Sequence, residues 1–332
     1  MATLASLTHQ SPSATVRGME NASREIRSAL VVGAGAVGAA VAGVIAEHDP
    51  AAVRILASGD RLERYRKEGF ILNGVRKSFS LVTPQDGGEA DLIIVCVKTY
   101  QLEQAIRDMG AHVGPRTLIL SLLNGISSED ALADAFGQEK VPYAMILGID
   151  AVREGNTTRF STAGKIHFGD ARNAEGAWSP RVSRISAFFT RTGVAHVVPP
   201  DMIRSLWYKC MINVGINQVS AVVGGTYGLF QANAEAQAVM EAAMAEVVAV
   251  SKAKGTGLQD SDIGAWYRTL KELGPESKTS MLQDVEAGRK TEVDAFAGTM
   301  IQLGRQTGTP VTVNETLYGL LKAIEARPAD GA

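Results

Sequence analysis

A run of glycines near the N-terminus restricts the fold of this chain more than any other feature. The segment ALVVGAGAVGAAVAGVIAEH places Gly33, Gly35 and Gly38 between a short β-branched run and a long run of small helix-forming residues. The first glycine allows a tight turn, the second lets a pyrophosphate approach the backbone, and the third lets the helix pack on the strand. Free N–H groups at the helix N-terminus favour phosphate oxygens. This segment therefore predicts a dinucleotide-binding turn, formed by Gly33, Ala34, Gly35, Ala36, Val37 and Gly38.

Further β-rich runs alternate with helical patterns in the first half of the chain, which predicts a parallel sheet with crossover helices. The runs are VRILA (53–57), LIIVCV (92–97), TLILSL (117–122) and YAMILGI (143–149), with smaller strands expected in KSFSLV (77–82) and KIHFG (165–169). After HVVPPD (196–201) nearly everything is long, Ala-rich and helical in period. We therefore predict a doubly wound α/β Rossmann domain over 29–198 and an all-α domain over 199–327.

Residues 1–28 are poor in acids and rich in Ser and Thr, and we expect them to form a disordered extension. A transit peptide is the alternative, and Met19 is an alternative start.

Charge and cysteine content narrow the class of partner. The 332 residues include 33 basic and 35 acidic side chains, so the net charge is −2 and gives no footprint for nucleic acid or for a membrane surface. No apolar run reaches the ~20 residues of a membrane span. Cys96 and Cys210 lie in apolar runs, as reduced core cysteines do, which favours a cytoplasmic location. Small molecules are the expected partners, and no metal site is expected.

The end of the second predicted strand bears on cofactor preference. An acid there would hold the ribose hydroxyls of NAD, whereas an Arg would hold the 2′-phosphate of NADP. The segment ILASGDRLERYR has Ser58 in this place, no acid, and Arg61 and Arg64 shortly after. We therefore predict NADP. In the alternative, both arginines form a solvated helix face and Ser58 alone contacts the cofactor.

A second constellation lies in LWYKCMINVGINQ, residues 206–218, where Lys209, Asn213 and Asn217 follow at steps of four. On a helix such side chains form one stripe, and the remaining positions here are mostly apolar. An unpartnered buried amide costs roughly 1–3 kcal/mol, so the stripe must face polar groups. A carbonyl that is reduced needs a proton donor, and Lys209 is the predicted one. Alternatively, the lysine reaches water and the amides bond to neighbouring backbone.

Other donors are less well supported. None of the histidines has a recognisable acidic partner at helical or strand spacing; they are His9, His48, His112, His167 and His196. Tyr267 and Lys271 mimic the Tyr-x-x-x-Lys pair of short-chain dehydrogenases, but they lie in the helical half and follow a different glycine pattern.

Two helix starts are predicted in KTSMLQDVEAGRKTEVDAF. Ser280 with Gln283, and Thr291 with Asp294, fit capping boxes, and Gly288 is expected to end the first helix. Glu292 would then begin a new element and could face the same pocket as Ser280. Ser280 either caps its helix or binds a carboxylate with the help of nearby N–H groups.

Five segments together resemble the ketopantoate reductase family in order and spacing, over about residues 29 to 325. They are GAGAVG, VCVKTYQ, LLNGIS, WYKCMINVGINQVSAV and TSMLQDVEAGRKTEVD. The resemblance implies NADPH-dependent reduction of 2-dehydropantoate to pantoate, on the route to pantothenate. It also implies an active site in the cleft between a Rossmann domain and a helical domain. A homodimer is an open alternative to a monomer.

The resemblance further implies a role for each matching residue. Lys209 would protonate the C2 alkoxide, and Glu292 would contact both the substrate and Lys209. The residues near the nicotinamide would be Lys98, Asn124 and Glu292. The substrate would be bound by Asn124, Asn213 and Asn217, and its carboxylate by Ser280. This chain departs from the family at Ser58, where an Arg is common, and at Tyr227, where an Asn often touches substrate.

Two other functions remain open. One is the reduction of a different 2-oxo acid, or the oxidation of a β-hydroxy acid. The β-hydroxyacid dehydrogenases also use Lys and Asn four apart, but usually have a second Asn where Val214 stands here. The other is an NADP-sensing protein without turnover, for which a damaged polar constellation would be expected.

Overall fold

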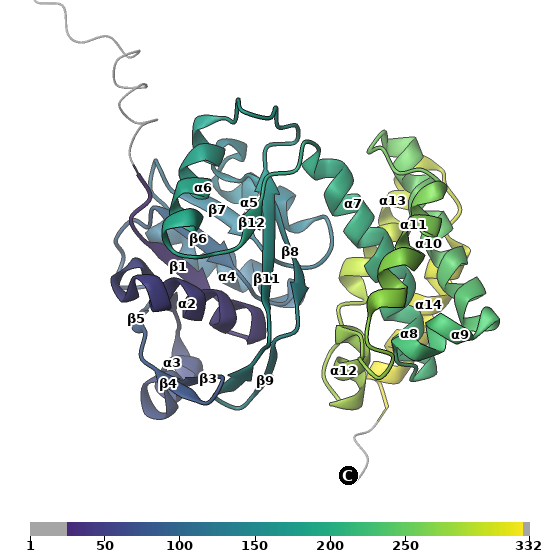
Figure 1. The fold of residues 1–332 in the computed structure, drawn as a ribbon, viewed down its shortest axis with the longest axis horizontal. Helices are drawn as coiled ribbons and strands as arrows, with labels where there is room; N and C mark the ends of the chain where they lie inside the picture. The colour runs from purple at the N-terminus through teal and green to yellow at the C-terminus, as the bar shows by residue number, and fades with distance from the viewer. Residues whose placement is uncertain (1–24, 328–332) are drawn as a thin grey trace, which may run out of the picture.

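The computed structural model describes residues 25–327, and all of its strands precede a purely helical half (Figure 1). Five strands form a parallel sheet in the order β5-β2-β1-β6-β7. Val31 in the central strand lies opposite Ile55 on one side and Ile94 on the other. The strands are β1 (Ala29–Val32), β2 (Val53–Leu56), β5 (Ser80–Val82), β6 (Leu92–Val95) and β7 (Leu118–Ser121). The predicted Rossmann-type sheet is confirmed.

Helices cover both faces of this sheet, because its strands are apolar on both sides. The helices of this half are α2 (Ala36–His48), α3 (Gly59–Glu68), α4 (Leu102–Met109), α5 (Ser128–Phe136) and α6 (Pro180–Arg191), with 3₁₀ turns η1 (Pro50–Ala52), η2 (Thr99–Gln101), η3 (Gly110–His112) and η4 (Gln138–Lys140). Val31 belongs to a core shared with α2 and α6. Its neighbour Val32 belongs to a core shared with α4 and α5.

The strand predicted at 143–149 exists, but its expected place in the parallel sheet is wrong. β8 (Tyr143–Ile149) pairs antiparallel with β11 (Ala163–Gly169), which in turn pairs parallel with β12 (His196–Val197). No helix separates β8 from β11, so the chain returns antiparallel instead of crossing over. The fifth parallel strand is β5, which comes from the less certain KSFSLV run.

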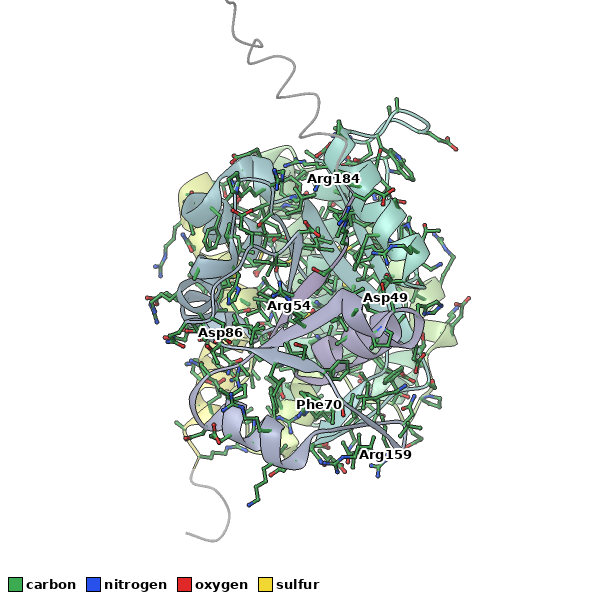
Figure 2. All side chains as sticks on the ribbon, turned by 90° about the vertical axis from the view of Figure 1, so that its left-hand side faces the viewer. Asp49, Arg54, Phe70, Asp86, Arg159 and Arg184 are labelled. Atoms are coloured by element: carbon green, nitrogen blue, oxygen red, sulfur yellow. The ribbon has the colours of Figure 1, made fainter. Side chains whose placement is uncertain are left out.

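A third, small sheet lies at one end of this half. It contains β3 (Phe70–Leu72), β4 (Val75–Lys77), β9 (Val152–Glu154) and β10 (Thr157–Arg159), in the order β4-β3-β10-β9. Figure 2 shows Phe70 and Arg159 of this sheet at the end of the molecule opposite Arg184 of α6. The sheet joins segments far apart in sequence, since β3 pairs with β10.

The helical half surrounds the long helix α10. Its elements are α7 (Met202–Ile212), η5 (Asn213–Asn217), α8 (Gln218–Val223), α9 (Tyr227–Ala232), α10 (Ala234–Lys254), α11 (Ser261–Glu272), α12 (Ser280–Glu286), η6 (Asp294–Gly298), α13 (Thr299–Thr307) and α14 (Thr312–Glu325). Two of these, η5 and η6, are π-helical, which the sequence did not predict. Gly215 in η5 permits close approach to α10, because a Cβ there would lie 2.5 Å from Met244.

The predicted N-terminal extension is too long. Within residues 25–28, Ile26 is buried in the core, and the backbone N–H of Arg27 donates to Asp91 at 2.9 Å. Residues 1–24 lie outside the described part of the chain. Among the helices between residues 25 and 327, none combines the length and apolar character needed to cross a bilayer.

Candidate active site

The glycine turn has the geometry that its motif predicts. Gly33 adopts a φ of +93°, and a Cβ there would lie 2.6 Å from Val97. A Cβ on Gly38 would lie 2.1 Å from the carbonyl oxygen of Gly33, so the helix can approach the turn only without a side chain. Gly35, at the N-terminus of α2, is exposed and faces open space. The turn therefore fits a pyrophosphate, with Ala36 and Val37 half-buried behind it.

Ala34, a buried residue of this turn, is tied to the rest of the domain through its carbonyl group. The Ala34 carbonyl accepts hydrogen bonds from the Tyr65 hydroxyl at 3.3 Å and from the Arg153 guanidinium. Arg153 also stacks over the rings of Tyr65 and Phe70, at 5.5 and 5.4 Å from their centroids. Arg153 comes from β9 of the small sheet, so sequence reasoning had no local signal for it.

Ser58 lies at the end of β2 as predicted, but an acid accompanies it. Its hydroxyl donates to the carboxylate of Asp108, from α4, at 3.4 Å. Arg61 is half-buried and Arg64 is exposed, 5.8 Å from the ring of Tyr65. The predicted 2′-phosphate site therefore has both arginines and the carboxylates of Asp60 and Asp108 nearby.

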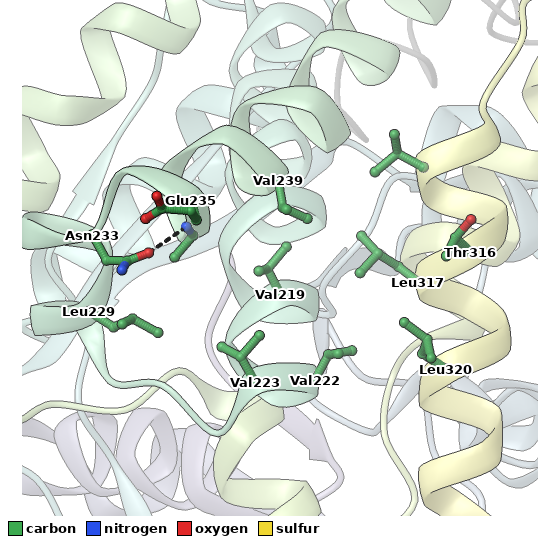
Figure 3. Close-up of a pocket in the computed structure, with 12 residues that line it drawn as sticks. Val219, Val222, Val223, Leu229, Asn233, Glu235, Val239, Thr316, Leu317 and Leu320 are labelled. Carbon is green, nitrogen blue, oxygen red and sulfur yellow. Dashed lines mark hydrogen bonds between the residues drawn. The ribbon is translucent and has the colours of Figure 1, made fainter.

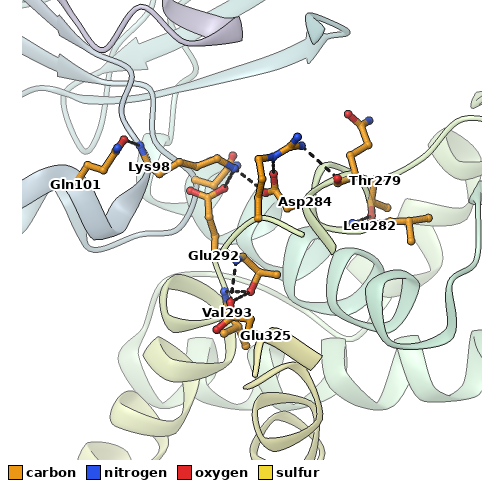
Figure 4. Close-up of polar contacts among 12 residues, drawn as sticks. Lys98, Gln101, Thr279, Leu282, Asp284, Glu292, Val293 and Glu325 are labelled. Carbon is orange, nitrogen blue, oxygen red and sulfur yellow. Dashed lines mark hydrogen bonds and ion pairs between the residues drawn. The ribbon is translucent and has the colours of Figure 1, made fainter. Parts of the chain in front are cut away.

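A chain of polar contacts joins the two halves of the molecule. The Lys209 amine donates to the Asn124 carboxamide oxygen at 3.0 Å, and the Asn124 amide donates to Glu292 at 3.1 Å. Lys98, from the end of β6, donates to Glu292 at 3.1 Å and to Asp284 at 2.9 Å. Figure 4 shows Lys98 reaching from the sheet half to both carboxylates of the helical half. The structure thus brings together Lys98, Asn124, Lys209 and Glu292.

The two lysines of this chain differ in their proton affinity. Burial lowers the pKa of Lys209 to about 8, although the charges of Glu292 and Glu129 oppose this effect. Burial also acts on Lys98, but the charges of Glu292 and Asp284 outweigh it and raise the pKa of this lysine. Lys98 therefore stays an ammonium near neutrality, whereas Lys209 can gain or lose a proton.

Asn213 and Asn217 begin and end the π-helical segment η5. Asn217 is 6% exposed and Asn213 is half-buried. Neither side-chain amide has a hydrogen-bond partner among residues 25–327. π segments occur frequently at functional sites, where they change the direction of side chains. The sequence predicted the polar character of these positions but placed them on a regular α-helix.

The predicted helix cap at Ser280 is wrong, because Thr279 is the cap. The Thr279 hydroxyl accepts from the backbone N–H of Leu282 at 3.2 Å, and Ser280 is exposed at the first position of α12. Gly288, with a φ of +61°, follows the end of α12 as predicted. Glu292, 5% exposed, lies in the turn before η6.

The second predicted capping box is also absent. Thr291 donates its hydroxyl to Glu325 at 2.6 Å, and Asp294 begins the π-helical η6. Tyr227 packs against the core of the helical half, and its N–H donates to the Ser277 carbonyl at 3.1 Å. The Tyr267 hydroxyl donates to Glu241, so its hydrogen-bond partner is not a residue of the predicted site.

Three residues near the site were missed. Asp284 is a buried acid on the apolar side of α12, next to Met281 and Leu282, and this position was a usable signal. Glu129 is 3% exposed, accepts from Ser128 at 2.9 Å, and burial raises its pKa to about 7. His167, on β11, is half-buried; burial, with the charges of Lys165 and Lys209, lowers its pKa.

An apolar groove of about 580 Å³ lies elsewhere in the helical half. Figure 3 shows Val219 and Val222 of α8 opposite Leu317 and Leu320 of α14. None of the predicted site residues lines it, so the groove and the polar site are distinct.

Two family models match the chain. The ketopantoate reductase PanE/ApbA model matches residues 29–173, and its C-terminal counterpart matches residues 201–325. The chain belongs to the ketopantoate reductase family. It is therefore an oxidoreductase, and the resemblance found in its motifs is confirmed.

Individual proteins of known name are similar over most of this family member. A 2-dehydropantoate 2-reductase of Halobacterium salinarum is 27% identical, with 89% of this chain and 98% of the relative covered. D-mandelate dehydrogenase, solved with NADH and anilino(oxo)acetate, has a TM-score of 0.80 at 19% identity, covering 90% of this chain and 98% of the other. A dimeric ketopantoate reductase from Staphylococcus aureus has a TM-score of 0.75 at 19% identity, with the same coverage. The two structures show a shared fold.

Proposed function

We propose that this family member reduces 2-dehydropantoate to pantoate with NADPH. The observation that carries the proposal is the hydrogen bond between Lys209 of the helical half and Asn124 of the sheet half, at 3.0 Å. This hydrogen bond holds the Lys209 amine, which can gain or lose a proton near neutral pH, beside the half that carries the glycine turn. The name of the Halobacterium salinarum relative supports the substrate.

The cofactor would be held by the glycine turn and by the end of β2. Residues 33–38 would offer backbone N–H groups to the pyrophosphate, with open space at Gly35, and Ser58 would contact the adenosine ribose. Arg61 and Arg64 support a 2′-phosphate, whereas the carboxylate of Asp108 favours the ribose hydroxyls of NAD as the alternative. When bound, the nicotinamide supplies the hydride for C2 of the substrate.

Lys209 would act as the general acid. As the C2 oxygen gains negative charge, the ammonium stabilises it and transfers a proton, so that ketone, hydride and proton together give the alcohol. A pKa of about 8 is close to the value that favours proton transfer near neutrality. Asn124 orients the amine through its hydrogen bond, and the negative charge of Glu292 helps the amine stay protonated.

The free amides of Asn213 and Asn217 would bind the substrate. Each offers one acceptor and two donor hydrogens, which suits a hydroxyl and an oxo group. The exposed hydroxyl of Ser280, at the start of α12, would donate to the substrate carboxylate. Neither amide has a protein partner in the part of the chain that the structure describes, so both are available to hydrogen-bond to a bound substrate.

Reduction of another 2-oxo acid is the second candidate. Tyr227 stands where the family often has an Asn, and D-mandelate dehydrogenase shares the fold. An NADP sensor is less well supported, because every member of the polar constellation is present. We further infer domains at 29–198 and 199–327, and a homodimer, for which the Staphylococcus aureus protein is a precedent.

The test is the consumption of NADPH and of NADH with a panel of 2-oxo acids that includes 2-dehydropantoate. We expect 2-dehydropantoate with NADPH to give the highest kcat/KM. Lys209→Ala should lower kcat by about 100-fold or more. Lys252→Ala, which removes an exposed lysine paired with Asp260, is the matched control. A Lys209→Ala enzyme that kept most of its rate would contradict the assigned acid.

A further inference from the structure

We propose that Gln218 is the positioning residue that fixes the two π-helical segments relative to each other, so that Asn213, Asn217 and Glu292 face one substrate. This inference rests on the substrate-binding role proposed for these three residues. Gln218 is fully buried, and its carboxamide contacts both η5 and η6.

The first contact replaces a helical hydrogen bond that η5 lacks. In an α-helix, the backbone N–H of Gln218 would donate to the carbonyl of Val214. Here the backbone N–H of Gln218 donates to the carbonyl of Gly215 instead. The side-chain Nε2 of Gln218 donates to the Val214 carbonyl at 2.7 Å. The side chain thus takes the place of its own backbone group at the end of the π segment.

The second contact does the same for η6. In an α-helix, the N–H of Ala297 would donate to the carbonyl of Val293. In η6 that carbonyl accepts from Gly298 at 3.0 Å, five residues on. The N–H of Ala297 donates to Oε1 of Gln218 at 3.1 Å. One carboxamide therefore satisfies a carbonyl of the first π segment and an N–H of the second.

A carboxamide of this length can serve both segments at once. Asparagine is shorter, an ionised glutamate accepts but cannot donate, and an apolar side chain does neither. The second hydrogen of Nε2 goes to the Asn314 oxygen at 3.1 Å, and the Asn314 amide donates to Glu246 at 2.8 Å. Gln218 is thereby fixed from α14 and α10 as well.

The groups proposed to contact substrate lie within the first segment and directly before the second. Asn213 and Asn217 are the first and last residues of η5, and Glu292 lies two residues before η6. Loss of the Gln218 bridge leaves a buried carbonyl and a buried N–H unsatisfied, so the segments must shift to find other partners. The amides would then meet the substrate at altered distances, whereas the glycine turn would not move.

The experiment measures steady-state kinetics of Gln218→Met with 2-dehydropantoate and NADPH. We expect KM for the oxo acid to rise about tenfold, the effect of one lost hydrogen bond, while KM for NADPH stays within about twofold of wild type. The matched control is Gln231→Met, since Gln231 donates to the carbonyls of Leu270 and Leu273 at 2.9 and 2.8 Å. It should lower the melting temperature without changing either KM.

Gln218→Glu is the second variant, and it serves if the methionine variant does not fold. Its carboxyl group can donate to Val214 only when protonated, so KM for the oxo acid should approach the wild-type value as the pH falls. A pH-independent, wild-type KM in both folded variants overturns the inference. If only Gln218→Glu folds, a wild-type KM of this variant at all pH values overturns the inference.

Asn217→Ala separates this inference from the proposed function. If it raises KM for the oxo acid while the Gln218 variants do not, the bridge is structural only. If Asn217→Ala leaves KM unchanged, the substrate site itself has been assigned wrongly.

Discussion

The amine of Lys209 contacts the carboxamide of Asn124, at 3.0 Å, and no carboxylate between residues 25 and 327 lies within ion-pair distance of it. Asn124 stands between Lys209 and Glu292 and bonds to both. The charge of Glu292 therefore acts on Lys209 through space and through the shared Asn124 amide. The ion-pair partner of Glu292 is Lys98. This arrangement leaves the Lys209 proton available for transfer.

Replacement of Asn124 should impair the proton donor more than it impairs cofactor binding. In Asn124→Ala the Lys209 amine loses its oriented partner, so we expect kcat to fall by about 10- to 100-fold. NADPH affinity, measured by fluorescence titration, should change less than kcat. Asn156→Ala, which removes a hydrogen bond to the Glu68 carbonyl, is the control and should keep wild-type kcat. An Asn124→Ala enzyme as fast as wild type would contradict the orienting role.

The reductive rate should fall as the pH rises through about 8, where Lys209 loses its proton. Glu129 carries a buried negative charge above its pKa of about 7, and this charge favours the ammonium. Glu129→Gln should therefore shift the alkaline limb to lower pH by about half a unit or more. Below pH 6 both enzymes carry a neutral group at this position and should have equal rates.

Several charged groups act on the protonation of Lys209, and the control variant must leave all of them unchanged. Glu292 and Glu129 favour the Lys209 ammonium, and His167 lies close enough to be influenced by it. Asp134→Asn removes an exposed carboxylate of the same helix, α5, and should leave the alkaline limb in place. Identical pH profiles for wild type and Glu129→Gln would rule out the effect of Glu129.

Lys209 should lower the free energy of unfolding at neutral pH. Its pKa is about 8 in the folded protein against an ordinary value of 10.5, so between these values the unfolded chain binds more protons and stability rises with pH. Lys209→Met removes this cost and should raise the free energy of unfolding by about 1–3 kcal/mol at pH 7. The gain should shrink toward pH 10 in urea unfolding. A gain that is constant over this range would show another origin.

The third glycine of the turn should tolerate no side chain. In Gly38→Ala the new methyl group would lie 2.1 Å from the Gly33 carbonyl oxygen, so we expect a loss of about 2 kcal/mol or more and weaker dinucleotide binding. Gly264→Ala, in α11 with open space at its Cβ, should be neutral or stabilising by up to about 1 kcal/mol. Thermal unfolding and NADPH titration measure both effects, and equal stabilities of the two variants would exclude the proposed close contact.

Asp108 should weaken the preference for NADPH. Asp108→Asn removes the negative charge beside Ser58, and we expect the ratio of kcat/KM for NADPH to that for NADH to rise about three- to tenfold. Asp134→Asn, at an exposed position of α5, is the matched control. An unchanged ratio in Asp108→Asn would place the 2′-phosphate away from Ser58.

The parts of the fold that were predictable are encoded locally. The parallel strands follow from short apolar runs, and the glycine turn from three positions within six residues. The antiparallel pairing of β8 was not predictable, because strand direction depends on the chain between β8 and β11. The cap at Thr279 and not at Ser280 shows how little separates two adjacent hydroxyl residues.

The site was predictable in its residue types but not in its connections. The steps of four identified Lys209, Asn213 and Asn217. The π segment that carries the two amides depends on Gln218 and Ala297, which are 79 positions apart. Asp108 meets Ser58 from 50 positions away, and Asp284 meets Lys98 from 186. Such contacts have no periodic signature in a single sequence.

The double hydrogen bond to the Ala34 carbonyl has a thermodynamic consequence. Because Tyr65 and Arg153 both donate to this one oxygen, the backbone of the turn is restrained before any dinucleotide arrives. Ordering a loop upon association normally consumes part of the affinity. Here that loss of freedom has already occurred during folding, so pyrophosphate contacts translate more fully into a low Kd.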